Sequence, residues 1–90
     1  MVMYSVVLSK QAVKHVKMLK AAHLSDKVKS LLSILQNNPF QNPPPYEQLV
    51  GDFKGLYSRR INHKHRLVYL VDNDSKTVRV LSMWTHYETI

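Results

Sequence analysis

Apolar and polar positions follow two different periods along the chain, and the first change of period comes near residue 9. Residues 4–8 are rich in β-branched and aromatic side chains, which predicts a short first strand. From residue 10 to about residue 23, apolar side chains recur at helical spacing, which indicates an amphipathic helix. Ser9 stands just before this helix, where its hydroxyl can accept a hydrogen bond from a free backbone N–H of the first turn.

A second helical pattern follows after the short link His23-Leu24-Ser25. Its apolar side chains give the clearest amphipathic pattern of the chain, at Leu24, Val28, Leu31, Leu32 and Leu35. Ser25 is the predicted N-cap, and the run Asn-Asn-Pro at residues 37–39 is predicted to end the helix. Because the link is short, we expect the two helices to form an antiparallel hairpin.

The last half of the chain changes to β-forming side chains. Residues 39–54 include three consecutive prolines and are predicted to form a long, stiffened loop. Three strands are predicted after it, separated by turn-forming residues: Leu56 to about Asn62, Arg66 to Asp72, and Thr77 to about His86. Strands joined by short turns form an antiparallel meander.

Together these elements predict a single α+β domain over residues 1–90. It consists of an N-terminal strand, an antiparallel two-helix hairpin and a three-strand antiparallel meander. The helices are expected to pack on one face of the sheet and to leave the other face open.

Composition narrows the class of protein. Thirteen Lys and Arg residues oppose six Asp and Glu residues, and the resulting charge of +7 favours a polyanionic partner such as nucleic acid or an acidic protein. The chain has no cysteine, which excludes disulfides, thiolate metal sites and a cysteine nucleophile, and which favours a reducing cytoplasm. We expect neither a signal peptide nor a membrane span, because no apolar stretch is long enough.

The densest cationic segment is GLYSRRINHKHRLVYLV, residues 55–71, which contains no acidic side chain. A turn at residues 62–64 divides it into two strands. Because side chains alternate along a strand, Arg59 and Arg60 are predicted to face opposite sides, with Arg60 on the side of Ser58. At most one of the two arginines can then point straight into a shared site.

For four of the histidines and for the tryptophan, the sequence predicts no catalytic or metal-binding role. His63 and His65 have the spacing of a metal-binding pair, but they lie at a turn without a clear third ligand, and we predict no metal site. His15 and His23 are expected on the surface of the first helix and its link. Trp84 is expected in the core or in a half-buried part of the sheet.

A few side chains that are distant in sequence have the chemistry to cleave RNA. The ribose 2′-OH is RNA's own nucleophile, so cleavage needs a base, an acid and a cation that holds charge at phosphorus. Glu47 is the candidate base and His86 the candidate acid. Arg66 together with Arg60 would hold the charge, because guanidinium binds phosphate oxygens in pairs, and Tyr87 could stack on a base.

A meander can bring the end of its third strand beside the start of its second, and hence His86 near Arg66. From spacing alone, however, Glu47 could also be a structural or inert loop residue. The pair His86-Tyr87 could likewise serve packing.

A resemblance to a known family adds to this reading. PPPYEQLVGDFKGLYSRRINHKHRLVYLV, residues 43–71, followed by MWTHY, residues 83–87, resembles the YoeB/Txe family of bacterial toxins, within the RelE-like superfamily. The resemblance implies a ribosome-dependent endoribonuclease that cuts mRNA in the ribosomal A site, without a cofactor, and halts translation. It also implies a small acidic antitoxin of the YefM/Axe type as partner, binding of operator DNA through the toxin–antitoxin complex, and a possible homodimer.

The family's catalytic positions fall on Glu47, Arg66, His86 and Tyr87. Its paired arginines, which support RNA binding, fall on Arg59 and Arg60, and Lys54 is a further RNA-binding candidate. His65 also matches a family position, where we expect a structural role. Some members end at the His-Tyr pair, whereas this chain continues with residues 88–90.

Two other functions fit the same charge. A basic module could occupy the ribosome or RNA and block translation sterically, with a dependence on Arg59 and Arg60 but not on Glu47. The chain could also be a structural partner of an acidic protein, without any role on RNA.

Overall fold

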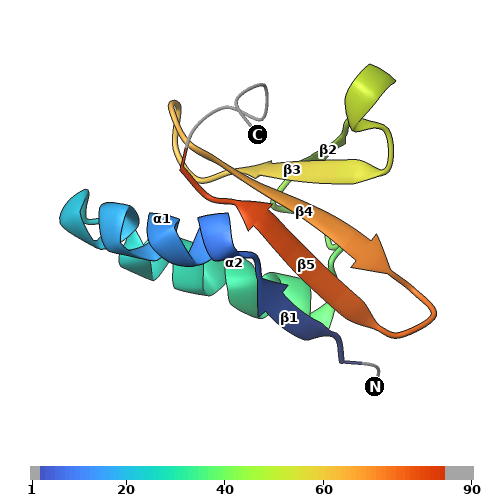
Figure 1. The fold of residues 1–90 in the computed structure, drawn as a ribbon. Helices are drawn as coiled ribbons and strands as arrows, with labels where there is room; N and C mark the ends of the chain where they lie inside the picture. Colours follow the sequence, from blue (N-terminus) through green and yellow to red (C-terminus); the bar gives the residue numbers. More distant parts are fainter. Residues whose placement is uncertain (1–2, 85–90) are drawn as a thin grey trace.

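The computed structural model describes residues 3–84, which form one five-stranded sheet and two α-helices (Figure 1). The elements have these bounds: β1 Ser5–Leu8, α1 Lys10–Ala21, α2 Ser25–Asn37, β2 Tyr46–Gln48, a 3-10 turn Gly51–Phe53, β3 Leu56–Arg60, β4 Arg66–Asp72 and β5 Thr77–Ser82. The predicted α+β class and the helix-on-sheet arrangement are confirmed, and the predicted elements occur in the expected order with one additional strand, β2, among them.

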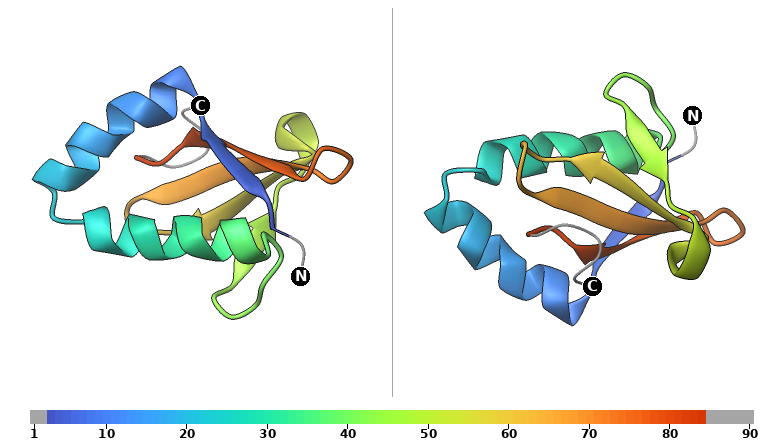
Figure 2. Two further views of the ribbon diagram at one scale, coloured as in Figure 1. Left: turned by 90° about the horizontal axis from the view of Figure 1, so that it is seen from below. Right: turned by 90° about the horizontal axis from the view of Figure 1, so that it is seen from above.

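The strand order is β1-β5-β4-β3-β2. β1 runs parallel to β5. The two helices carry the chain from β1 at one edge of the sheet to β2 at the opposite edge, and the antiparallel strands then lead back to β5. All other pairs are antiparallel. Both helices lie along one face of the sheet, and they diverge from their link rather than running side by side (Figure 2). We call this the covered face, and the one that the helices leave uncovered the open face.

The helix starts differ in how they are capped. Ser9 caps α1 as predicted, because its Oγ accepts a hydrogen bond from the backbone N–H of Ala12 at 3.1 Å. The prediction for α2 is wrong, since Ser25 is its first helical residue and Leu24 occupies the N-cap position without a side-chain hydrogen bond. Asp26 in the first turn of α2 instead provides the negative charge that suits a helix N-terminus.

The predicted loop at residues 39–54 contains a strand, so the meander has four strands in the described part of the chain instead of three. This strand, β2, pairs antiparallel with β3 and places Glu47 opposite Ser58. The turn between the two strands uses Gly51 and Gly55 at φ values of 68° and 95°, which glycine adopts without the steric cost of a side chain.

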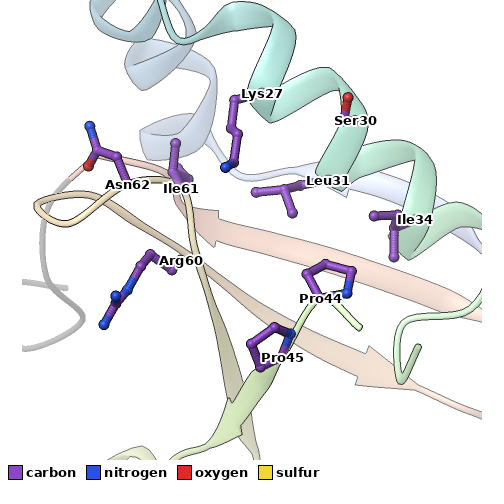
Figure 3. Close-up of a pocket in the computed structure, with 9 residues that line it drawn as sticks. All are labelled: Lys27, Ser30, Leu31, Ile34, Pro44, Pro45, Arg60, Ile61 and Asn62. Atoms are coloured by element: carbon purple, nitrogen blue, oxygen red, sulfur yellow. The ribbon is translucent and has the colours of Figure 1, made fainter. Parts of the chain in front are cut away.

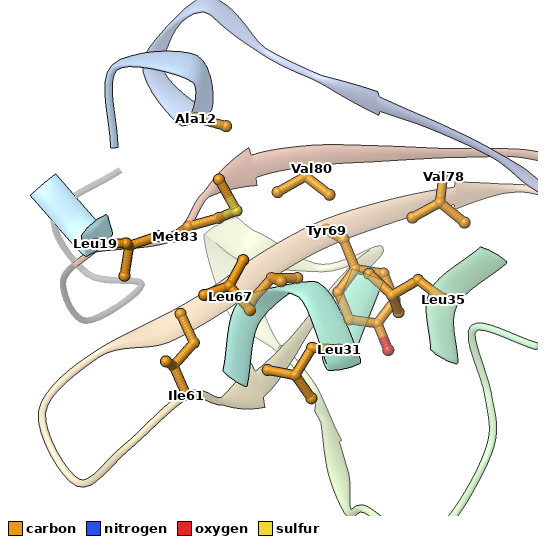
Figure 4. Packing of buried hydrophobic residues seen from close by; sticks show 11 residues of the cluster. Ala12, Leu19, Leu31, Leu35, Ile61, Leu67, Tyr69, Val78, Val80 and Met83 are labelled. Carbon is orange, nitrogen blue, oxygen red and sulfur yellow. The ribbon is translucent and has the colours of Figure 1, made fainter. Parts of the chain in front are cut away.

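The core lies between the helices and the covered face (Figure 4). Its buried side chains come from both helices, from β4 and β5, and from the residues that follow β3 and β5: Ala12, Leu19, Val28, Leu31, Leu35, Ile61, Leu67, Tyr69, Val78, Val80 and Met83. Along β4, Leu67 and Tyr69 point into this core, so the residues alternating with them, such as Arg66, project from the open face.

Two buried polar side chains of the covered face attach the proline-rich segment to the sheet. The guanidinium of Arg59 donates hydrogen bonds to the carbonyl oxygens of Pro39, Gln41 and Pro44, at 2.9, 2.8 and 2.6 Å. The Tyr69 hydroxyl donates to the Pro39 carbonyl at 2.8 Å, and burial raises the pKa of Tyr69 to about 12. These bonds fix the path of the chain that leads into β2.

Candidate functional site

Three neighbouring strands place polar side chains together on the open face. Glu47 of β2 lies opposite Ser58 of β3, and Arg60 of β3 lies opposite Arg66 of β4. Residues paired across strands project from the same face, so all four share one surface. Together with Pro45 and Tyr46, these four residues line a cleft of about 250 Å³.

Arg66 is held by two contacts of a single nitrogen. Its Nη1 donates a hydrogen bond to Ser58 Oγ at 3.0 Å and forms an ion pair with Glu47 Oε2 at 3.4 Å. The Glu47 side chain is 60% exposed, and an ion pair with such exposure contributes little energy. The hydrogen bond to the buried Ser58 hydroxyl therefore does more to orient the guanidinium, and the carboxylate stays accessible from the cleft.

Arg60 provides a second cation at the same place. Its side chain is exposed and makes no hydrogen bond or ion pair with any other residue between 3 and 84. Like charges directly opposite on neighbouring strands repel each other, so the cross-strand pair Arg60–Arg66 favours binding of an anion between them. A carboxylate beside two guanidinium groups can accept a proton while the cations hold a phosphate.

Arg59 does not contribute to this cleft. Its side chain is 1% exposed on the covered face, where it donates to the three carbonyls that anchor the proline-rich segment. A guanidinium committed in this way cannot meet RNA at the surface, so the RNA-binding role predicted for Arg59 is replaced by a structural one. The predicted alternation is confirmed, since Arg59 and Arg60 face opposite sides.

Lys54 is exposed just after the 3-10 turn, at the opposite end of β3 from Arg60. It is not among the residues that line the cleft. RNA binding by Lys54 therefore stays a prediction, and the contact would have to lie outside the cleft.

His65 has the structural role expected for it. Its ring is buried and stacks on Trp84, with the ring centroids 4.0 Å apart at an interplanar angle of 20°. Burial lowers the pKa of His65, and the nearby Lys64 and His63 lower it further. The neutral ring is favoured, and it secures Trp84 against the basic hairpin of residues 55–71.

The histidine that sequence reasoning misjudged is His15. It is half-buried rather than on the surface, and its Nδ1 accepts a hydrogen bond from the backbone N–H of Met83 at 3.1 Å. Burial also lowers the pKa of His15, which favours the neutral ring that can accept this bond. The bond joins α1 to the chain just after β5, a contact that local sequence patterns do not report. His23 is exposed, as predicted.

The predicted acid and stacking residue, His86 and Tyr87, lie outside the described residues. β5 does end beside the start of β4, because Ser82 pairs with Val68. The approach of His86 to Arg66 stays a prediction. Within residues 3–84, no group of three or more His, Cys, Asp or Glu side chains is arranged to hold a metal ion, and no helix there is long and apolar enough to cross a membrane.

Comparisons with known proteins agree on one group. Residues 10–87 match the family described as the YoeB-like toxin of bacterial type II toxin–antitoxin systems. The chain is 36% identical over 52 residues to a toxin YoeB of Mycobacterium bovis; this match covers 58% of the chain and 61% of the relative, or about three fifths of the relative's length.

Two similar solved structures come from Staphylococcus aureus. A YoeB–YefM complex gives a TM-score of 0.75 at 34% identity, and a YoeB dimer gives 0.79 at 31%. In both cases 96% of this chain and 100% of the other are covered.

Proposed function

The chain belongs to the YoeB-like toxins of bacterial type II toxin–antitoxin systems, and on this premise we propose that it is a ribosome-dependent endoribonuclease. It would cut mRNA in the ribosomal A site and thereby inhibit translation in the cytoplasm. The observation that carries the proposal is the cleft of the open face. There the accessible carboxylate of Glu47 lies beside the guanidinium of Arg66, and β3 adds Arg60.

The residues of the cleft fit a metal-independent cleavage. Glu47 takes the proton of the ribose 2′-OH, and the 2′ oxygen forms a bond to phosphorus. Arg66 and Arg60 hold the negative charge that builds up on the phosphate oxygens, a stabilisation that preorganised donors supply effectively. The bond from phosphorus to the 5′ oxygen breaks, and His86 is expected to protonate that oxygen. Tyr87 is expected to stack on a neighbouring base.

Replacement of Glu47 by Gln tests this function. The amide keeps the size of the side chain but cannot act as the base, so we expect the cleavage rate to fall by about a hundredfold or more. The measurement is the mapping of new mRNA 5′ ends in a purified translation system. Gln48→Ala is the matched control, because Gln48 is the next residue of β2 and projects from the other face.

The same assay separates cleavage from a steric block. If translation stops without new 5′ ends, and if Glu47→Gln stops it equally well, the protein acts as a basic binding module instead. If translation continues unchanged, the chain has no role on RNA, and a structural partnership with an acidic protein remains.

We further propose a small acidic antitoxin of the YefM type as the partner that neutralises the toxin. The net charge of +7 supports it, and so does the similarity to the toxin of a YoeB–YefM complex. Operator DNA would be bound only through that complex. The similarity to a YoeB dimer supports a homodimer of the free toxin.

A further inference from the structure

A second cavity lies next to the cleft, between α2 and the chain that enters β2 (Figure 3). Its volume is about 360 Å³, and its lining comes from three parts of the chain: Lys27, Ser30, Leu31, Ile34, Pro44, Pro45, Arg60, Ile61 and Asn62. We call it the helix-side pocket. It shares Pro45 and Arg60 with the cleft, so the two hollows adjoin across these residues.

The helix-side pocket has apolar walls and cationic edges. Leu31 and Ile34 point from α2 toward Pro44, so that aliphatic surfaces face one another across a gap (Figure 3). Lys27 adds positive charge, and Arg60 borders the pocket while its guanidinium points away from the gap (Figure 3). No acidic side chain is among the described residues that line the pocket. Such a slot suits a planar apolar ring that is attached to an anionic chain.

The walls of the pocket are preformed. The carbonyl oxygen of Pro44 accepts the 2.6 Å hydrogen bond from buried Arg59, which holds the proline wall in place without a ligand. On another side, Asn62 Oδ1 accepts hydrogen bonds from the backbone N–H groups of Lys64 and His65, at 2.8 and 2.7 Å. These bonds fix the Asn62 side chain and with it this end of the pocket.

We propose that the helix-side pocket binds the base of the nucleotide next to the cleaved linkage of the mRNA. The inference rests on the proposed function, because the phosphate of that linkage must lie in the cleft. Arg60 borders both hollows, so it can hold a phosphate while the adjoining base enters the gap between α2 and the prolines. Lys27 then lies near the backbone beyond that base.

Base removal combined with a pocket-filling variant tests the proposal. The probe is a short single-stranded oligoribonucleotide with a 2′-O-methyl group at the cleavage position. It is used in three forms: intact, without the base on the 5′ side of the linkage, and without the base on the 3′ side. Ser30→Leu fills the pocket from an exposed position of α2. Ser33→Leu is the matched control, since exposed Ser33 lies on the same helix beside a different hollow.

For the unchanged protein, we expect the removal of one of the two bases to weaken binding about tenfold, the size typical for one stacked base. Ser30→Leu should weaken binding of the intact probe to a similar extent and show no further loss with the abasic probe. Ser33→Leu should behave like the unchanged protein. Fluorescence anisotropy at low salt measures the dissociation constants.

A second pair of variants tests the charge at the edge of the pocket. Lys27→Gln should lower the slope of log affinity against log salt by roughly 0.7, the value for one lost phosphate contact on a single strand. Lys29→Gln is the control, because Lys29 lines hollows elsewhere on α2. Equal slopes for the two variants would contradict a backbone contact at Lys27.

The proposal is overturned if the unchanged protein binds both abasic probes as tightly as the intact probe. It is also overturned if base removal weakens binding to the Ser30→Leu variant as much as binding to the unchanged protein. It is also overturned if Ser30→Leu leaves RNA binding unchanged but raises the amount of antitoxin needed to restore translation, since a segment of the antitoxin then fills the pocket. The proposed function is tested by a different measurement, the Glu47-dependent formation of new mRNA 5′ ends. A failure of that function can therefore be distinguished from a failure of the pocket proposal, which is measured by probe binding.

Discussion

On the covered face of the sheet, Arg59 is 1% exposed and donates to three backbone carbonyls, whereas on the open face Arg60, the next residue of β3, is exposed and borders two hollows. The two side chains have the same chemistry and differ only in the face from which they project. On the covered face a guanidinium satisfies buried oxygens and supports the fold. On the open face it remains available for a ligand, so charge alone does not identify a binding residue.

The strongest test of this contrast removes an arginine of the open face. Arg66→Ala is expected to lower the rate of mRNA cleavage by about a hundredfold or more, because a preorganised donor to the reacting phosphate is lost. Arg60→Ala should act in the same direction. The measurement is single-turnover cleavage of ribosome-bound mRNA, with urea unfolding as control. If the variant loses stability as well as cleavage, the arginine of the open face also supports the fold, and the contrast between the two faces is contradicted.

The converse test removes the arginine of the covered face. Arg59→Ala leaves the carbonyls of the proline-rich segment without their donor, and we expect the free energy of unfolding to fall by about 3 kcal/mol. Arg60→Ala, at an exposed position of the same strand, should change it by less than about 0.5 kcal/mol. Urea denaturation measures both. Equal losses for Arg59 and Arg60 would show that Arg59 is not a structural anchor.

A smaller effect is expected for Ser58, which orients Arg66 from within the sheet. Ser58→Ala removes the acceptor at 3.0 Å from Nη1 and should lower kcat about tenfold with little change in KM, as expected for one lost hydrogen bond to a charged group. Ser58→Thr restores the hydroxyl at a strand position that suits a β-branched residue. If Thr does not restore kcat, Ser58 acts through packing and not through Arg66.

The smallest effect is a dependence of stability on pH that arises from His15 and His65. Burial lowers the pKa of both histidines below 6.5 in the folded protein, so the unfolded chain takes up protons first as the pH falls. Their contribution to stability is fully present above pH 6.5 and is lost as the pH falls toward the folded pKa values.

Urea midpoints measured between neutral and mildly acidic pH check this dependence. His15→Gln should flatten the curve, and the exposed His23→Gln should leave it unchanged. If the unchanged protein and both variants show the same dependence of stability on pH, His15 does not contribute to it.

Sequence patterns predicted the parts of the fold that depend on local periodicity. The core stripe of α2 and the alternation along β3 were readable because burial repeats with the period of the element. β2 was not readable, since three residues after a run of prolines carry too short a pattern. Its pairing with β3 is a tertiary contact.

The same limit applies to the site. Glu47 and Arg66 could be named from chemistry and resemblance, and the structure brings them within 3.4 Å. The anchoring role of Arg59 and the bond between His15 and Met83 depend on segments that are distant in the chain, at separations of 15–20 and 68 residues. No local spacing encodes such partners, so these roles became visible only in three dimensions.

The position of β2 at the end of the strand order has a consequence for thermal behaviour. A three-residue edge strand that pairs on one side only opens more readily than the central strands, and its amides are expected to exchange hydrogen early. Glu47 lies on this strand, so each local opening removes the carboxylate from Arg66 while the core stays intact. Catalysis is therefore expected to fade on warming at temperatures below the global melting transition.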